Sequence, residues 1–255
     1  MGHDHEGRRV SRRRLITGIS SLGLGSLISA SGPGVRATAL ADSRFAGAPA
    51  CALTPSATKG PFYFDSDLVR RDIREDRPGV RLDLAVRVQD SRTCRPLPGA
   101  VVEIWQCDAA GLYSGAEKVS KHGVVAAPST TAENGKSDWT DLKPADNKRY
   151  LRGAQAANGA GVVEFTTIWP GWYRGRTVHI HVMVHISDRR VLSTQLMFDD
   201  ALNAEVLSRP PYSGREGRRD TFNQGDEDFR DGVLLKVTKQ GDGYLGTVVL
   251  TADPE

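Results

Sequence analysis

Several short stretches of the chain alternate apolar and polar residues and are separated by Gly, Pro and Asp. The alternation is clearest over residues 80–88, 161–169 and 191–198. A period of two is typical of a strand with one buried face. The more continuous apolar run at 100–107 also predicts a strand, and residues 232–238 and 243–251 predict a closing hairpin.

The stretch from Pro170 to Val184 passes through a Pro-Gly turn and a glycine at 175 into a β-branched strand that carries His179 and His181. Side chains two apart on a strand share a face, so the two imidazoles project together. A turn at 187–190 predicts an antiparallel hairpin with 191–198, which brings Gln195 near the histidines. His185 lies about 13 Å beyond His181 at the usual strand rise, too far to share a metal, and we interpret it as structural.

The segments between the predicted strands are long. Residues 53–64 and 208–231 are punctuated by Pro, Gly and charge, which predicts loops. Residues 123–158 are polar without helical periodicity, and a loop of that length in a compact domain is typically a functional cover or mobile. The fold we expect is all-β: an antiparallel β-sandwich with long loops and little helix.

Residues 1–41 resemble a twin-arginine export signal. Arg12 and Arg13 lie in the charged segment 11–17, a short apolar stretch follows at 18–30, and small residues at 39–41 suit cleavage. The apolar stretch is short and rich in Gly and Ser, so we expect no stable membrane anchor. The sequence therefore predicts export to the periplasm or the extracellular space and a single folded domain over 42–255.

The export segment also accounts for the apparent basicity of the chain. Residues 1–41 hold six arginines against two carboxylates, a net of +4, whereas the whole chain carries +3, which leaves about −1 for the rest. We therefore expect no nucleic-acid partner.

Three cysteines are present, and an oxidising compartment permits a disulfide. Cys51 precedes a turn-rich segment and Cys94 lies in a turn, so we expect these two to pair. Cys107, on a predicted strand, is then a reduced core thiol. The sequence alone does not fix this connectivity.

Four pieces occur in a specific order: residues 60–63, Tyr113 after the strand at 100–107, the turn from Pro170 to Tyr173, and an arginine three residues before the H-x-H pair. This order resembles the intradiol ring-cleavage dioxygenases, the family of protocatechuate 3,4-dioxygenase and catechol 1,2-dioxygenase. The resemblance spans residues 53–198. The export signal and the cysteines are most similar to the secreted branch of that family.

The resemblance implies a non-haem Fe(III) held by Tyr113, Tyr173, His179 and His181, with hydroxide or water in the fifth position. The residue types suit that ion. Ferric iron is a hard, highly charged acid that removes the phenol proton, and two phenolates favour Fe(III) over Fe(II).

The implied reaction inserts both atoms of O₂ into a catechol and cleaves the ring between the hydroxyls to a cis,cis-muconate. Tyr173, Arg176 and Gln195 would be catalytic, with Tyr173 acting as a base and Arg176 stabilising negative charge on the ring. Pro61, Tyr63 and Trp172 would line the substrate pocket, although packing roles are open for all three. The partners are then catechols and O₂, and a homo-oligomer is compatible with the sequence.

Two other classes of protein fit parts of the sequence. A Zn or Fe(II) site built on the H-x-H pair needs a carboxylate ligand, for which Asp108 and Glu164 are the candidates. A secreted β-sandwich binding module would use Trp139, Trp169 and Trp172 to hold a polysaccharide. Neither alternative accounts for the two tyrosines.

Overall fold

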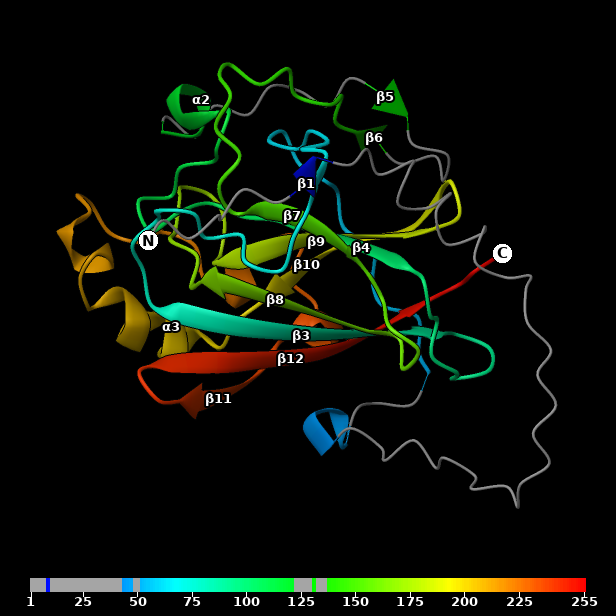
Figure 1. Ribbon diagram of the computed structural model, residues 1–255. Helices are drawn as coiled ribbons and strands as arrows, with labels where there is room; N and C mark the ends of the chain where they lie inside the picture. The colour runs from blue at the N-terminus through cyan, green and yellow to red at the C-terminus, as the bar shows by residue number, and fades with distance from the viewer. Residues whose placement is uncertain (1–7, 10–42, 48–50, 122–129, 132–136) are drawn as a thin grey trace, which may run out of the picture.

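The computed structural model describes residues 8–9, 43–47, 51–121, 130–131 and 137–255. Two larger sheets dominate this part of the chain (Figure 1). In spatial order, the first contains β1 (Arg8–Arg9), β2 (Leu68–Val69), β7 (Arg152–Ala156), β4 (Val101–Trp105), β9 (His179–Ile186) and β10 (Arg189–Met197). The second contains β11 (Lys236–Gln240), β12 (Gly243–Ala252), β3 (Arg81–Asp90) and β8 (Val162–Ile168).

The remaining elements are short. Strands β5 (Thr130–Thr131) and β6 (Ser137–Asp138) pair with each other. The α-helices are α2 (Glu117–Lys121) and α3 (Asp200–Leu207), and the 3₁₀ turns are η1 (Ser43–Phe45), η2 (Tyr212–Gly214), η3 (Asn223–Gly225) and η4 (Asp231–Val233). Strands thus outweigh helices in the described residues, as the all-β prediction requires.

The prediction of purely antiparallel pairing is wrong. Strand β12 runs parallel to β3 from Tyr244 beside Leu82 to Ala252 beside Asp90, and β2 is parallel to β7. A hairpin fixes antiparallel pairing only between strands joined by a short turn. Strands β3 and β12 are separated by residues 91–242, so no short turn constrains their relative direction.

The prediction that residues 123–158 form one loop is also wrong, because β7 lies within it. Arg152 begins this strand with a fully buried side chain, whose guanidinium donates from Nε to Ser114 Oγ at 2.9 Å and from Nη2 to the Phe62 carbonyl at 2.8 Å. A charged residue is rarely buried without such partners. The polar residues of this strand therefore led the sequence to predict a loop.

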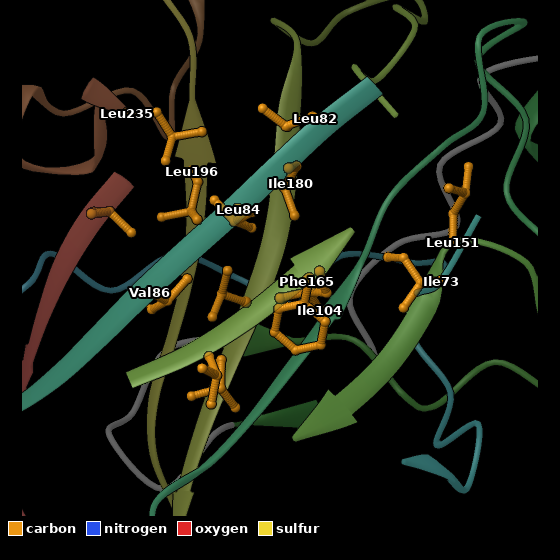
Figure 2. Close-up of a cluster of buried hydrophobic side chains, with 14 of the residues drawn as sticks. Ile73, Leu82, Leu84, Val86, Ile104, Leu151, Phe165, Ile180, Leu196 and Leu235 are labelled. Atoms are coloured by element: carbon orange, nitrogen blue, oxygen red, sulfur yellow. The ribbon is translucent and has the colours of Figure 1, made fainter. Parts of the chain in front are cut away.

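Apolar side chains of the two larger sheets meet in one core (Figure 2). Leu82, Leu84 and Val86 alternate along β3 and point into it, as their period of two predicts. Phe165 of β8 enters from the same sheet. From the larger sheet come Ile104, Ile180 and Leu196, on three neighbouring strands.

Strand β9 has neighbours on both edges, β4 and β10, and a different role on each face. Ile180 and Val182 belong to the main core. His179 and His181 therefore project from the opposite face, where Met183 joins a second, smaller apolar cluster. The sheet thus places the histidine pair on its outer side, against the loops.

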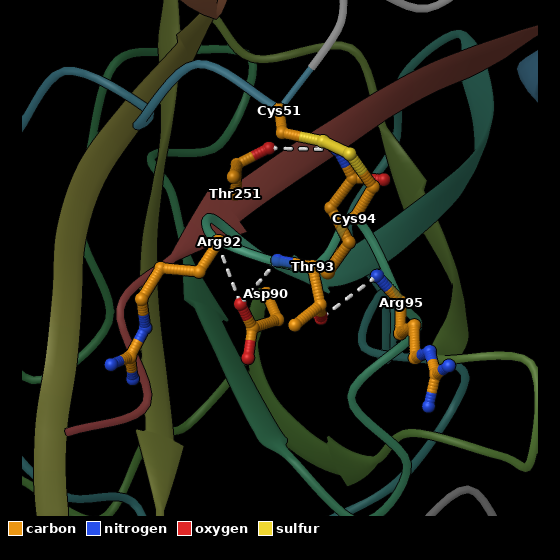
Figure 3. Close-up of a disulfide and its surroundings, with 8 residues drawn as sticks. Cys51, Asp90, Arg92, Thr93, Cys94, Arg95 and Thr251 are labelled. Carbon is orange, nitrogen blue, oxygen red and sulfur yellow. Dashed lines mark hydrogen bonds between the residues drawn. A yellow bond between two sulfur atoms is a disulfide. The ribbon is translucent and has the colours of Figure 1, made fainter.

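A disulfide joins Cys51 to Cys94 (Figure 3). The turn that carries Cys94 is held by Asp90, whose carboxylate accepts from the backbone N–H groups of Arg92 and Thr93 at 2.7 and 3.0 Å. The bridge fastens the start of the segment 51–64 to the turn between β3 and β4. Cys107 is buried and reduced.

Two residues of the expected export segment, Arg8 and Arg9, pair with β2, and residues 10–42 lie outside the described part of the chain. Within the described residues, no helix has the length and apolar character needed to cross a membrane.

Candidate metal centre

Four side chains converge on the outer face of β9. The Nε2 atom of His179 lies 3.1 Å from Nε2 of His181, 3.1 Å from the Tyr173 hydroxyl and 3.5 Å from the Tyr113 hydroxyl. All four side chains are buried, with Tyr113 fully so and Tyr173 the most exposed at 8%. Two imidazoles and two phenols from three separate segments therefore share one point inside the protein.

Local structure explains how each group reaches this point. The histidines lie two apart on β9. Tyr113 follows the end of β4, in a turn where Asp108 accepts from the N–H of Leu112 at 3.0 Å. Tyr173 follows Gly171, where a Cβ would lie 2.5 Å from the Asp108 carbonyl, so only glycine allows the Tyr173 turn to pack this closely on the Tyr113 turn.

Contacts away from the shared point fix the orientations of both imidazole rings. His179 Nδ1 lies 2.7 Å from the Thr177 carbonyl, and since a carbonyl only accepts, Nδ1 carries the proton and Nε2 has a lone pair when the ring is neutral. The ring of His181 stacks on Trp105 at 4.8 Å with an angle of 4° between the planes. Both Nε2 atoms thus face the shared point.

Burial keeps these groups neutral in the protein without a cation. It raises the pKa of Tyr113 well above its usual value, and it raises the pKa of Tyr173 to about 12 although the charge of Arg176 opposes the rise. Burial, together with the charge of Arg176, lowers the pKa of His179 to about 3 and that of His181 well below its usual value. The site is a set of uncharged donors with no carboxylate among them.

Arg176 and Gln195 lie together beside this cluster. Gln195 pairs with His181 across the β9–β10 hairpin, as the sequence predicted. Its Oε1 accepts from Arg176 Nη2, and its Nε2 donates to the Thr58 carbonyl at 3.2 Å and to Asp228 at 3.0 Å. The arginine is no surface charge, since only 17% of its side chain is exposed.

Comparison with known proteins identifies the family. The family model described as dioxygenase matches residues 55–209. An intradiol ring-cleavage dioxygenase from Tetranychus urticae has a similar structure, with 32% identity, 80% of this chain and 96% of that chain covered, and a TM-score of 0.69. The chain belongs to the intradiol ring-cleavage dioxygenases.

Two further relatives have lower sequence identity to this dioxygenase. The dioxygenase domain of a dioxygenase–carbohydrate-binding fusion from Streptomyces sp. SirexAA-E is 26% identical, with 80% of this chain and 100% of that chain covered and a TM-score of 0.56. A chlorocatechol 1,2-dioxygenase from Rhodococcus opacus is 24% identical over 153 residues, which is 57% of this chain and 56% of that protein. The match thus spans about half the length of that curated relative.

The three residues expected to bind substrate in this dioxygenase lie in different surroundings. Tyr63 is buried and its hydroxyl donates to Glu103 at 3.1 Å, so it packs beneath the site. Trp172 lines a cavity of about 730 Å³ together with Tyr173, under the guanidinium of Arg215 at 4.0 Å from the ring centroid. Pro61, two residues before Tyr63, is half-buried.

Sequence reasoning gave no role to three parts of the site. Phe62 stacks on Tyr113 with ring centroids 4.6 Å apart, and although it lies in the matching stretch 60–63, the sequence predicted no contact for it. Gly60, at φ +69°, lies so near the histidines that a Cβ would be 3.2 Å from His181 Cε1. The acidic residues around Arg176 were also missed, since they lie about fifty residues downstream.

Neither alternative class gains support from the geometry. Glu164 lies on β8 in the other sheet and pairs with Arg44 and Arg71. Among the described residues, no group of three His, Cys, Asp or Glu side chains is placed to hold a metal, so the histidine pair has no carboxylate partner. Trp169 is fully buried with its indole N–H on Asn203, and Trp172 is 8% exposed, so neither can offer an open ring face to a polysaccharide.

Proposed function

We propose that this dioxygenase is a non-haem Fe(III) enzyme that cleaves a catechol between its two hydroxyls to give a cis,cis-muconate. The observation that carries the proposal is the convergence of Tyr113, Tyr173, His179 and His181, with three of their contacts to one another between 3.1 and 3.5 Å. Family membership makes ring cleavage between the hydroxyls the reaction class.

The donor set fits ferric iron. Two phenols can each lose a proton to a hard cation, and two neutral imidazoles add lone pairs, whereas ferrous oxygenases use two histidines and a carboxylate. The shared point has no carboxylate, so the tyrosines have to supply the negative charge. Tyr113, Tyr173, His179 and His181 would hold the ion.

Bound Fe(III) would supply Lewis-acid chemistry, which withdraws electron density from a catechol ring and makes a ring carbon reactive toward O₂. The atoms balance without a further reductant, because catechol and O₂ together have the composition of muconic acid. Both oxygen atoms of O₂ therefore end in the product.

The protein's own groups have definable tasks in this reaction. Tyr173 would be the base, as the family resemblance implies, with its phenolate oxygen accepting a proton from a catechol hydroxyl. Its side chain also lines the cavity of about 730 Å³. Arg176, buried and always charged, would stabilise negative charge that develops on the ring. Phe62, Tyr63 and Trp105 shield the site from water.

Ring cleavage of catechol under ¹⁸O₂ tests this proposal. The iron-loaded protein should consume about one O₂ per catechol, and mass spectrometry of the muconate should show two ¹⁸O atoms in the product. Only one labelled atom, or a product cleaved beside the hydroxyls instead of between them, would reject it. Resorcinol, whose hydroxyls cannot chelate one ion, is the control substrate and should not react.

A further inference from the structure

Two acidic residues surround the Arg176 guanidinium in a way that the family motif does not include. Asp226 Oδ2 accepts from Nε at 3.0 Å, Asp226 Oδ1 accepts from Nη2 at 3.3 Å, and Asp228 lies 3.0 Å from the same Nη2. The side chain of Asp226 is fully buried. Both residues lie beyond position 209, where the match to the family model ends.

These contacts occupy two of the three guanidinium nitrogens. Nε and Nη2 are occupied by Asp226, Asp228 and Gln195, whereas Nη1 makes no hydrogen bond to any described residue. A guanidinium is planar, so fixing two of its nitrogens fixes the direction in which the third points. Asp226 thus determines where the remaining donor is aimed.

Asp226 is itself held firmly. Its Oδ2 also accepts from the Thr177 backbone N–H at 2.7 Å, next to the arginine in sequence. It follows directly after η3, where Asn223 donates to the Phe198 carbonyl at 2.8 Å and accepts from the Thr177 hydroxyl at 2.7 Å. The loop that carries the carboxylate is therefore fastened to the same short segment that leads into the histidine pair.

The two carboxylates are not equivalent. Although burial pushes it upward, the charge of Arg176 and its hydrogen bond hold the pKa of Asp226 below its usual value, so it is ionised. Burial raises the pKa of Asp228, and Arg176 offsets this only partly. Asp226 is the stronger partner of the arginine, by charge and by its two contacts.

We propose that Asp226 is a positioning residue for the ring-cleavage reaction: it holds the Arg176 guanidinium so that Nη1 faces the bound substrate. This inference rests on the proposed function of the site. Asp226 acts only through Arg176 and touches no substrate. A charge-assisted, buried contact of this kind fixes an angle that the flexible arginine side chain would not otherwise keep.

The main test is Asp226→Asn. The amide oxygen can still accept from the Thr177 N–H, but the charge is lost and an NH₂ group replaces one oxygen. The iron-loaded variant should keep its visible absorption, because no iron ligand is changed. We expect kcat for catechol to fall by about tenfold or more while KM changes far less. Asp253→Asn, which removes an exposed partner of Arg92, is the matched control and should behave as wild type.

A double variant separates positioning from a general loss of structure. Since Asp226 acts through Arg176, adding Asp226→Asn to Arg176→Ala should lower kcat by no more than about twofold beyond Arg176→Ala alone. Losses that multiply, or a single Asp226→Asn variant with wild-type kcat, would overturn the inference. Asp226→Glu, which keeps the charge but moves it by one methylene, gives the same test if the asparagine variant does not fold.

A crystal structure of Asp226→Asn gives a readout that needs no turnover. The guanidinium should leave Gln195 and take more than one orientation, whereas an unmoved Arg176 would overturn the inference. If wild type cleaves no catechol, the proposed function fails, and the displaced or unmoved guanidinium still decides the positioning claim.

Discussion

In the proposed function, Tyr113 and Tyr173 are the residues that decide the chemistry of the site. Each would be an ordinary buried aromatic without the other three groups, and each has its hydroxyl within 3.5 Å of His179 Nε2. Without a cation, burial keeps both phenols protonated. A metal that binds here therefore has to release phenol protons, which favours a hard trivalent ion over a ferrous one.

Replacing Tyr113 by Phe tests this residue-scale argument. The variant removes one hydroxyl and keeps the ring that stacks on Phe62, so the fold should survive. Removing a hydrogen-bond partner of a metal ligand typically lowers the metal affinity about 10–100-fold. Removing the ligand itself should lower the affinity at least as much. Equilibrium competition with an iron chelator measures the change.

The matched control is Tyr150→Phe. Tyr150 is as buried as Tyr113, and its hydroxyl donates to Glu117 at 2.7 Å, away from the shared point. This variant should hold iron as wild type does. Equal iron affinity in Tyr113→Phe and wild type would remove Tyr113 from the ligand set.

At the scale of elements, the segment 51–64 connects the disulfide to the candidate metal centre. Starting at Cys51, it bonds to β12 through Thr54, to β10 through Ala57 and Thr58, and reaches His181 at Gly60. It has no regular secondary structure of its own. Its position therefore depends on these few bonds and on the bridge to Cys94 (Figure 3).

We expect the disulfide to contribute measurably to stability. It links positions 43 residues apart, and closing a loop of that size in the unfolded chain stabilises the folded state by about 2–4 kcal/mol. Urea unfolding should show a lower midpoint for Cys51→Ser/Cys94→Ser than for wild type. Reductant should lower the wild-type midpoint and leave the double variant unchanged. A wild-type midpoint insensitive to reductant would contradict this role.

At the scale of the whole molecule, the sequence predicted what is local and periodic. The strands around 80–88, 161–169 and 191–198 correspond to β3, β8 and β10, and the closing hairpin to β11 and β12. Period-two patterns depend only on one face being buried. The direction of β12 against β3 depends on contacts between distant parts of the chain, so no local pattern contained it.

The candidate site shows the same division between local signals and contacts of distant parts of the chain. The H-x-H spacing on one strand is a local signal, and the hairpin that carries Gln195 follows from a short turn. Asp226 and Asp228 reach Arg176 only because the loop after η3 folds back onto β10, and a mixed-charge loop looks the same whether solvated or buried. The sequence therefore could not predict which charged residues of this loop are buried against a distant strand.

The most direct test of the account is the metal content and visible spectrum of the purified protein after loading with ferric iron. About one iron per chain should bind, with a reddish phenolate-to-Fe(III) absorption that changes when catechol is added without oxygen and that weakens in Tyr113→Phe. A protein that stays colourless after ferric loading, or that binds iron with no visible absorption, would contradict a site built from two tyrosines and two histidines.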